Sequence, residues 1–367
     1  MGKSSRNTKF SILLCEMDSS PLFVTMGMVI IDEIHFEHRP SVYDVIGGAG
    51  TYGVVGARLF LSNCPQKVGW IIDCGADFPD SVKNEIEGWN TSVVLRSTPH
   101  RLTTRGWNKY GSNEERAFKY TSPKLRIEVQ DLIRNPPLAL SRSFHLICSP
   151  TRCIDITTKL QEYWNSQSKK STSLKSLALD HFIIWEPVPD ECRPETWPAC
   201  IEALKDVDII TPNAKEAAMF FGLPEFQDKS SIESLAERYV DYLSKPGAAL
   251  VLRCGTKGCL VRTRSSSQWY PAYHGPQFAD YKVVDPTGGG NSFVGGLAAG
   301  LILGNSLEAA AICANVAASF AIEQIGMPQM TYNGGELWNR CDVNQRITEY
   351  CHRSGFEVPK LDSCDDI

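Results

Sequence analysis

The stretch that decides the fold reads Val283-Val284-Asp285-Pro286-Thr287-Gly288-Gly289-Gly290-Asn291-Ser292-Phe293. Strand-like residues lead into three glycines and then into a run of small apolar residues, which predicts a helix over Val294–Leu303. Without Cβ atoms, three backbone N–H groups can point into one place, and the helix dipole completes an anion hole suited to a phosphoryl group. The alternative is a tight strand–helix turn in which Asn291 only caps the helix. The stretch lacks the Lys-Ser/Thr ending of a Walker A loop, which disfavours a P-loop enzyme.

On both sides of this stretch, short apolar runs alternate with helix-like segments such as Ser231–Leu243. The predicted strands are Leu22–Ile31, Lys67–Ile72, His145–Cys148, Leu177–Ile184, Asp208–Thr211 and Ala248–Leu252. This alternation predicts a mainly parallel sheet covered on both faces, with ligands at the carboxyl ends of the strands. Thr103–Tyr120 breaks the alternation and predicts a hairpin-like flap around Gly111-Ser112-Asn113.

The composition describes a soluble globular protein and favours small-molecule chemistry over nucleic-acid binding. The chain has 367 residues, a formal charge of −5 and 43% hydrophobic residues. Its length predicts one large domain with an appendage, or two domains. A net negative charge creates no overall positive electrostatic potential that would attract the phosphates of a nucleic acid. We therefore expect neither a nucleic-acid partner nor an RNA-associated role.

The cysteines and the apolar runs indicate a cytoplasmic protein without a membrane anchor. The 13 cysteines contain no Cys-x-x-Cys pair, which favours reduced, mostly buried thiols over a disulfide framework or a zinc site. The apolar run Phe10–Cys15 is too short for a secretory signal. Phe293–Leu303 ends before the roughly 20 residues that span a bilayer.

A second motif follows the predicted strand at Asp208–Thr211, where Pro212 precedes Asn213-Ala214-Lys215-Glu216. Asn213 and Glu216 are three residues apart and share one face of the first helical turn. They could hold a hydrated Mg²⁺ together. The alternative is a capping arrangement in which Asn213 caps the helix and Glu216 bonds back to it.

Two further glycine-rich segments complete the set. Gly47-Gly48-Ala49-Gly50-Thr51-Tyr52-Gly53 leads into a predicted helix at Val54–Leu61 and would let a polar substrate approach the backbone, with Asp32 accepting from its hydroxyls. The alternative for Asp32 is an exposed turn. The other segment, Arg253-Cys254-Gly255-Thr256-Lys257-Gly258, follows a strand and could edge a nucleotide pocket; by itself it predicts a hairpin.

The order of these four segments resembles the ribokinase-like (PfkB) family of carbohydrate and nucleoside kinases, from about Phe23 to Gly326. The amino-acid sequences of three segments, including Ile183–Pro187, resemble those of a fungal branch of this family that is named for maintenance of killer. The resemblance implies a three-layer α/β/α sandwich with a mainly parallel central sheet and a small β flap near residues 32–48 and 100–122. We expect this domain to span 21–340, preceded by a flexible extension (1–20) and followed by a C-terminal segment with an acidic, frayed tail (341–367).

The resemblance also implies the site and its ligands, ATP and Mg²⁺. Gly288, Gly289 and Gly290 would hold the transferring phosphoryl group, and position 291 would face the acceptor hydroxyl. Asp32, Gly47, Gly48 and Tyr52 would line the substrate site. The residues implied for the nucleotide are Asn213, Glu216, Gly255, Thr256, Gly258, Thr287 and Asn315, with Glu216 and Asn213 also on the metal. Relatives often dimerise through the flap, which makes a homodimer an expectation.

Position 291 departs from the family in a way that bears on activity. Family members carry an Asp there, which takes the proton from the acceptor hydroxyl. A neutral amide has no usable basicity near pH 7, so Asn291 can orient a hydroxyl but cannot deprotonate it. Asp285 is a poor substitute, because Pro286 and the glycines separate it from position 291. Whether Asp32, Asp73 or Asp77 reaches the site is not readable from the sequence.

Two smaller departures accompany Asn291. Tyr52 or Thr51 replaces an Asn that usually contacts the sugar, and Arg253 replaces a Thr, either as a phosphate contact or as a surface residue. We therefore expect an ATP-dependent phosphotransferase on a sugar- or nucleoside-like hydroxyl, impaired at position 291. The alternative is a pseudokinase that serves as a nucleotide sensor or a protein-interaction scaffold.

Overall fold

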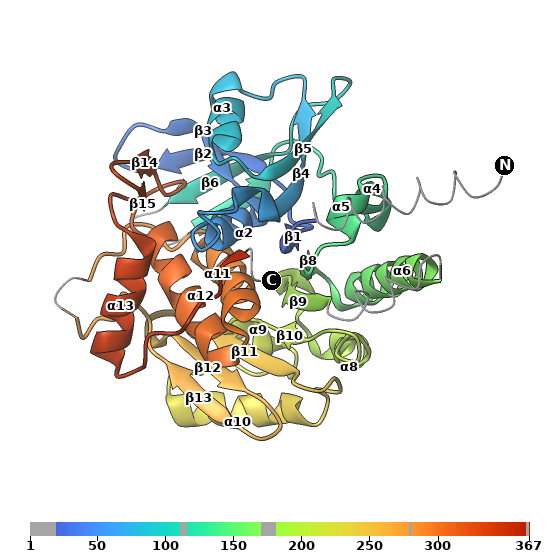
Figure 1. Ribbon diagram of the computed structural model, residues 1–367, viewed down its shortest axis with the longest axis vertical. Helices are drawn as coiled ribbons and strands as arrows, with labels where there is room; N and C mark the ends of the chain where they lie inside the picture. The colour runs from blue at the N-terminus through green and yellow to red at the C-terminus, as the bar shows by residue number, and fades with distance from the viewer. Residues whose placement is uncertain (1–19, 111–115, 170–180, 279–280, 365–366) are drawn as a thin grey trace. The chain divides into compact units, whose positions relative to one another are not determined.

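The computed structural model describes residues 20–110, 116–169, 181–278, 281–364 and 367. These residues form two compact units (Figure 1). Unit 1 comprises residues up to Val24 together with Glu128–Tyr270, and unit 2 comprises Thr25–Ile127 and Pro271–Ile367. The predicted flap turn at Gly111-Ser112-Asn113 and nearly all of the predicted N-terminal extension lie outside the described residues.

Unit 1 is an α/β unit with the strand order β13-β12-β11-β10-β9-β8-β1. Strands β8 (Ser143–Cys148), β9 (Phe182–Pro187), β10 (Ile209–Ile210) and β11 (Ala249–Arg253) are parallel. Strands β12 (Cys259–Arg262) and β13 (Ser267–Tyr270) continue the sheet antiparallel, and β1 is Phe23–Thr25. The helices are α4 (Val129–Ile133), α5 (Pro136–Ala139), α6 (Pro150–Ser168), α8 (Trp197–Ala203), α9 (Ala214–Met219) and α10 (Lys229–Val240).

Local chemistry explains where the helices of unit 1 begin. Ser149 caps α6 by accepting from the backbone N of Arg152, and Pro150 occupies the first helical position, where a missing N–H costs nothing. Asp228 caps α10 through the backbone N of Ser231 at 2.8 Å. Because β8 to β11 are parallel, their carboxyl ends lie at one edge of the sheet. The polar residues of the candidate site in unit 1 lie at or just after the ends of β9, β10 and β11.

Unit 2 contains a small sheet and a layer of helices. The small sheet has the order β3-β2-β6-β7 and consists of β2 (Ile30–Phe36), β3 (Val42–Gly47), β6 (Arg105–Tyr110) and β7 (Arg116–Tyr120). Strands β4 (Val68–Gly75) and β5 (Ser92–Thr98) form a parallel pair. The remaining elements are α2 (Ala49–Arg58), α3 (Asp80–Gly88), α11 (Gly289–Gly304), α12 (Leu307–Ala321), β14 (Met330–Tyr332), β15 (Glu336–Trp338) and α13 (Val343–Ser354).

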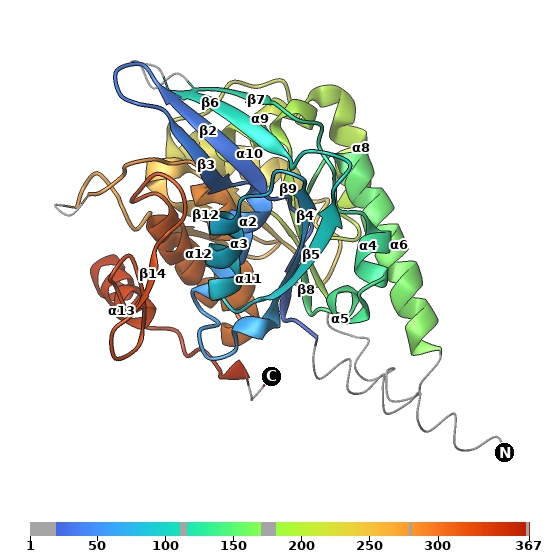
Figure 2. The same ribbon diagram turned by 90° about the horizontal axis from the view of Figure 1, so that it is seen from above.

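Small residues let the helices of unit 2 approach closely. Helices α11 and α12 run side by side in both views (Figures 1 and 2). A Cβ on Gly56 of α2 would overlap the backbone oxygen of Ser292, and one on Gly295 would overlap that of Gly53. The apolar run after the glycine-rich stretch is therefore a buried packing surface. In the described part of the chain, no helix is both long and apolar enough to cross a bilayer.

Several boundaries differ from the sequence-based expectation. The expected strand Leu22–Ile31 is divided into β1 and β2, with Met26–Val29 between them. Helix α11 begins within the triple glycine, at Gly289, whereas the apolar run predicted a start at Val294. Helix α2 likewise begins at Ala49. Glycine lowers helix propensity, but packing of α11 against α2 and α12 outweighs it.

The C-terminal segment and one cysteine pair also differ from expectation. Cys64 and Cys364 form a disulfide with a Cα–Cα distance of 6.4 Å, which corrects the expectation of reduced thiols for this pair. The backbone N of Asp362 donates to Leu303 O at 2.8 Å, so this part of the tail is held and not frayed. A separation of 300 residues leaves no spacing pattern from which the pair could be predicted. Most other described cysteines are buried free thiols, as expected.

Candidate active site

In unit 2, the turn before α11 is held by its own aspartate. The backbone N groups of Val284 and Asp285 both donate to Ile322 O, at 2.8 and 3.2 Å. The Asp285 carboxylate is 2% exposed and accepts from the backbone N of Thr287 at 2.9 Å. Asp285 therefore organises the turn, and that it does not replace a base at position 291 stays a prediction.

The start of α11 has the geometry of an anion-binding helix terminus. Gly288 is the N-cap and has a φ of 77°, a left-handed conformation that favours glycine. Gly289, Gly290 and Asn291 are the first three helical residues, and backbone N–H groups in a first turn have no acceptor within the helix. The backbone N of Gly289 donates to Pro286 O at 3.2 Å, which leaves the next two for an anion. A 16-residue helix adds the positive end of its dipole. The half-buried Asn291 stands at the third position of this turn.

Tyr52 of α2 lies directly against this turn. A Cβ built on Gly288 would overlap the Tyr52 ring at three of its carbon atoms. Tyr52 is 4% exposed. A buried aromatic ring therefore lies beside the N-cap of α11.

Asp32 lies in the small sheet, inside β2, so the exposed-turn alternative is wrong. Its two carboxylate oxygens occupy the positions where Cβ atoms of Gly47 and Gly106 would stand. Burial raises the pKa of Asp32 to about 7, against the lowering effect of a hydrogen bond from Asn108. Among the described residues, Asp32 Oδ1 is a buried oxygen without a hydrogen-bond partner. Gly48, with a φ of 93°, lies against the backbone of Met28 and Ile30.

Asp73 and Asp77, the other aspartates that the sequence left open, are engaged elsewhere. Asp73 pairs with Arg96 at 2.5 Å. Asp77 accepts from the backbone N of Thr103 at 2.7 Å and pairs with Arg105 at 2.5 Å. Burial acts to raise the pKa of Asp77, but these hydrogen bonds outweigh it and lower the pKa. Both carboxylates are therefore structural in unit 2.

In unit 1, Asn213 and Glu216 form the capping box that the sequence allowed. Asn213 Oδ1 accepts from the backbone N of Glu216 and Glu216 Oε2 accepts from that of Asn213, both at 2.8 Å. Asn213 is the N-cap of α9. Burial raises the pKa of Glu216, with Arg253 acting to lower it and Glu186 to raise it.

Arg253 is not a surface residue, which corrects that alternative; a phosphate contact stays a prediction. Its Nη1 lies 2.8 Å from Glu186 Oε1 and its Nη2 lies 3.3 Å from Glu216 Oε2. Arg253 is the last residue of β11, and Glu186 is the last but one of β9, two strands away in the same sheet. The parallel strands therefore bring the two side chains to one edge. The sequence analysis missed Glu186, although a glutamate at the end of an otherwise apolar strand marks such an edge.

Magnesium is the metal that the resemblance implies, and the residues here do not fit it. Asn213 Oδ1 and Glu216 Oε2 each accept a backbone N–H of the other residue, and a guanidinium nitrogen of Arg253 also lies 3.3 Å from Glu216 Oε2. A divalent cation at the same carboxylate would be repelled by Arg253. Within the described ranges, no group of three or more His, Cys, Asp or Glu side chains is placed to hold a metal ion.

The glycine turn after β11 opens onto a cavity of about 380 Å³. Asn213 and Arg253 line one part of it, and Gly255, Thr256 and Lys257 line another. Strands β11 and β12 form the predicted hairpin, with Gly255 (φ 56°) and Gly258 (φ 87°) in left-handed conformations at the turn. This cavity joins the two sequence segments that were assigned to the nucleotide within unit 1.

The remaining predicted nucleotide contacts lie in unit 2 and make internal hydrogen bonds. Asn315 Nδ2 donates to Ala311 O, one turn earlier in α12, at 2.9 Å. The backbone N of Thr287 is bonded to Asp285. A ligand contact for either residue stays a prediction.

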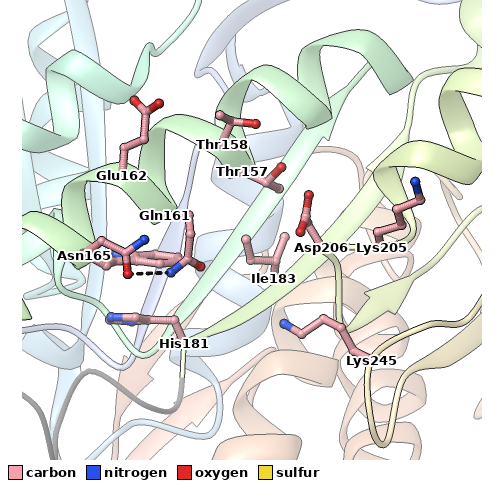
Figure 3. A pocket seen from close by; sticks show the side chains of 11 residues that line it. Thr157, Thr158, Gln161, Glu162, Asn165, His181, Ile183, Lys205, Asp206 and Lys245 are labelled. Carbon is pink, nitrogen blue, oxygen red and sulfur yellow. Dashed lines mark hydrogen bonds between the residues drawn. The ribbon is translucent and has the colours of Figure 1, made fainter.

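A second cavity of unit 1, about 510 Å³, contains none of the predicted site residues (Figure 3). Side chains of α6 and of the segment leading into β9 line it, including Thr158, Gln161 and His181 (Figure 3). Its cations are already paired: Lys205 lies 2.6 Å from Glu202, and Lys245 lies 2.7 Å from Asp208. The two lysines of this cavity therefore offer no unbalanced positive charge to a ligand.

Comparison with known proteins identifies the family. A model of the pfkB family carbohydrate kinases matches residues 183–330. Ribokinase from Giardia lamblia matches with a TM-score of 0.67 and 15% identity, over 90% of this chain and 100% of that chain. A putative ribokinase II from E. coli, solved in complex with ATP and Mg²⁺, matches with a TM-score of 0.62 and 17% identity, over 91% of this chain and 99% of that chain.

Protein MAK32 of Saccharomyces cerevisiae is 36% identical over 358 residues, which cover 93% of this chain and 94% of MAK32. The fold is therefore ribokinase-like α/β, and the chain belongs to the pfkB family of carbohydrate kinases. Within that family it is a MAK32-type protein, as the amino-acid sequences of the three segments predicted.

Proposed function

We propose that the chain binds ATP and is built for phosphoryl transfer to a hydroxyl of a sugar- or nucleoside-like acceptor, with transfer slowed by Asn291. The observation that carries this proposal is the start of α11. The backbone N–H groups of Gly290 and Asn291 together with the helix dipole support an anion site here, and we assign Asn291 to the acceptor hydroxyl, as the family resemblance implies. Asp32, beside Gly47, is the proposed acceptor-side carboxylate.

The expected loss of rate follows from the chemistry of the amide. A positioned general base contributes typically about 10²–10⁴-fold, or roughly 3–5 kcal/mol of barrier. The nearby carboxylate of Asp285 is committed to Thr287 and is almost fully buried. Nucleotide binding does not depend on the base, so affinity for ATP is retained when turnover is low.

The test is ADP release with a panel of sugars and nucleosides, for the wild type and for Asn291→Asp. We expect at least one acceptor for which Asn291→Asp is about 100-fold faster than the wild type. A wild type as fast as ordinary kinases of this family would show that the base argument is wrong. The matched control is Asn305→Asp, at the C-terminal end of the same helix, which leaves the rate unchanged.

The second candidate function is a pseudokinase that binds nucleotide as a sensor or scaffold. The buried ring of Tyr52 against Gly288 favours it, because this ring occupies space beside the N-cap that a substrate would need. Calorimetry with ATP distinguishes the two: binding without turnover in Asn291→Asp supports the pseudokinase. No binding would exclude both nucleotide functions and indicate a structural role.

We also propose a cytoplasmic homodimer in which the small sheet forms the contact. Tyr43, on β3, is 60% exposed and Phe118, on β7, is 50% exposed. Large exposed aromatic side chains on one sheet are typical of protein contacts. Sedimentation of the wild type and of Tyr43→Ser/Phe118→Ser tests the proposal, which predicts a dimer and a monomer respectively.

A further inference from the structure

Three charged side chains meet at the carboxyl edge of the parallel sheet in unit 1. Glu186, Glu216 and Arg253 have side chains that are 9, 7 and 12% exposed. The guanidinium of Arg253 reaches both carboxylates, through Nη1 and Nη2 respectively. His145 Nε2 lies 3.3 Å from the other oxygen of Glu186. Two negative charges and one fixed positive charge are therefore packed together.

The backbone explains why Arg253 points to this place. The backbone N of Arg253 donates to Pro212 O at 3.0 Å, and Arg253 forms an isolated bridge with Asn213. Strand β11 is thus tied to the start of α9, where the capping box holds Glu216. The arginine side chain leaves its strand beside the motif and is held there by main-chain bonds as well as by charge.

An arginine here performs the electrostatic task of a bound cation. Guanidinium stays protonated at all ordinary pH values and binds carboxylates through several donors in a fixed plane. It neutralises one of the two carboxylates and lies 3.3 Å from Glu216 Oε2, the same oxygen that accepts the backbone N–H of Asn213. A divalent cation would have to displace it or lie close to it, at a repulsive cost.

The same guanidinium borders the cavity beside the glycine turn. Arg253 lines this 380 Å³ space together with Lys215 and Lys257, so three cations border it against the single acid Glu225. Positive side chains that line a cavity attract phosphate groups directly. The cavity therefore supplies from protein side chains the positive charge that a metal supplies at other nucleotide sites.

We propose that Arg253 takes the place of a divalent cation at the Asn213–Glu216 motif, so that nucleotide binds to this protein without a metal held by Glu216. The proposal rests on the proposed binding of ATP and deepens it. Its consequence for the nucleotide-free protein is that the motif has no affinity for divalent cations. Its consequence for the complex is an affinity for nucleotide that is almost independent of Mg²⁺.

The first experiment needs no nucleotide. Mn²⁺ is titrated into the nucleotide-free protein, and free Mn²⁺ is followed by electron paramagnetic resonance. We expect no stoichiometric site in the wild type, and a new site at least about tenfold tighter in Arg253→Thr, because two uncompensated carboxylates then face each other. The site should disappear in Arg253→Thr/Glu216→Gln. Arg262→Thr is the matched control, because it removes an arginine of β12 from an ion pair with Glu237 of α10, and it should behave as the wild type.

A stoichiometric Mn²⁺ site in the wild type that Glu216→Gln removes would overturn the proposal. So would a folded Arg253→Thr variant, verified by circular dichroism, that gains no site. If Arg253→Thr does not fold, the wild type and Glu216→Gln still decide the question, because a Glu216-dependent site in the wild type contradicts the proposal and equal, weak binding supports it.

The second experiment compares ATP affinity of the wild type in Mg²⁺ and in EDTA by calorimetry. We expect the two dissociation constants to agree within about threefold. A loss of more than about tenfold in EDTA overturns this proposal while leaving ATP binding intact. No ATP binding in either buffer overturns the proposed function and the nucleotide part of this inference, and the Mn²⁺ titration then shows separately whether Arg253 blocks the motif.

Discussion

The ring of Tyr52 lies against the α-carbon of Gly288, the left-handed N-cap residue of α11. This contact joins the glycine-rich segment of α2 to the turn that carries Asn291. Both segments belong to unit 2, and neither position can change size without affecting the other.

Gly288→Ala should destabilise the protein by about 2–4 kcal/mol. The backbone there has a φ of 77°, which costs a residue with a Cβ roughly 1 kcal/mol or more, and the added methyl group would overlap the Tyr52 ring. Urea unfolding followed by fluorescence measures the change.

The matched control for that measurement is Gly334→Ala. Gly334 has a φ of 70°, is exposed, and has no atom within 4 Å of an added Cβ, so only the conformational cost of about 1 kcal/mol remains. Equal losses for the two variants would contradict the Tyr52 contact. In a Tyr52→Ala background, the penalty of Gly288→Ala should shrink toward the control value.

Asp32 should make the protein less stable as the pH rises from about 4 to about 7. Its pKa is raised from 3.8 to about 7 in the folded protein, so folding favours the protonated form. That stabilisation is fully present below pH 4 and is lost as the pH rises through 7. Asp32→Asn removes this dependence and should stabilise the protein at pH 8 by a few kcal/mol at most.

Urea midpoints at pH 4.5 and pH 8 test the prediction, with Asp241→Asn at an exposed position as the control. If Asp32→Asn and the wild type lose stability equally between these pH values, Asp32 is not the group responsible.

Glu323 should contribute stability that survives into strong acid. His274, Arg346 and Asn339 all bond its carboxylate, at 2.9, 2.8 and 3.1 Å. Against the effect of burial, these partners lower the pKa of Glu323 from 4.5 to about 2. The contribution is therefore present above pH 4.5 and is lost as the pH falls through 2.

Removing one member of such a buried ion pair costs about 3–5 kcal/mol. We expect Glu323→Gln to show this loss at pH 7 by urea unfolding. The control is Glu202→Gln, which breaks the exposed pair with Lys205 and should cost less than 1 kcal/mol. Similar losses for both variants would argue against the buried network.

The disulfide between Cys64 and Cys364 predicts that the unfolded, unreduced protein titrates two thiols fewer than its 13 cysteines. Cross-linking residues far apart in the sequence restricts the unfolded chain, so a reductant should lower the free energy of unfolding by about 2–4 kcal/mol. Cys364→Ser should be insensitive to the reductant. A full count of 13 thiols before reduction would show that the bond does not form in solution.

Most of the fold could be read from periodicity and from turn residues. The apolar runs at His145–Cys148 and Ala248–Leu252 became β8 and β11, because a strand buried on both faces is continuously apolar. The capping box at Asn213 and Glu216 was also visible in the sequence, because its hydrogen bonds join residues only three positions apart. The start of α11 at Gly289 was not visible, because packing against α2 and α12 overrides the low helix propensity of glycine.

The sequence by itself determined the family, the glycine-rich turn before α11 and the absence of a carboxylate at position 291, since each depends on neighbouring residues or on the order of motifs. Only the tertiary structure decided what Arg253, Asp32 and Tyr52 do. Arg253 meets Glu186 across 67 positions of sequence, Asp32 fills the space beside Gly106, and Tyr52 covers Gly288. These contacts arise from strand register and helix packing, which bring distant residues together, and no local pattern encodes them.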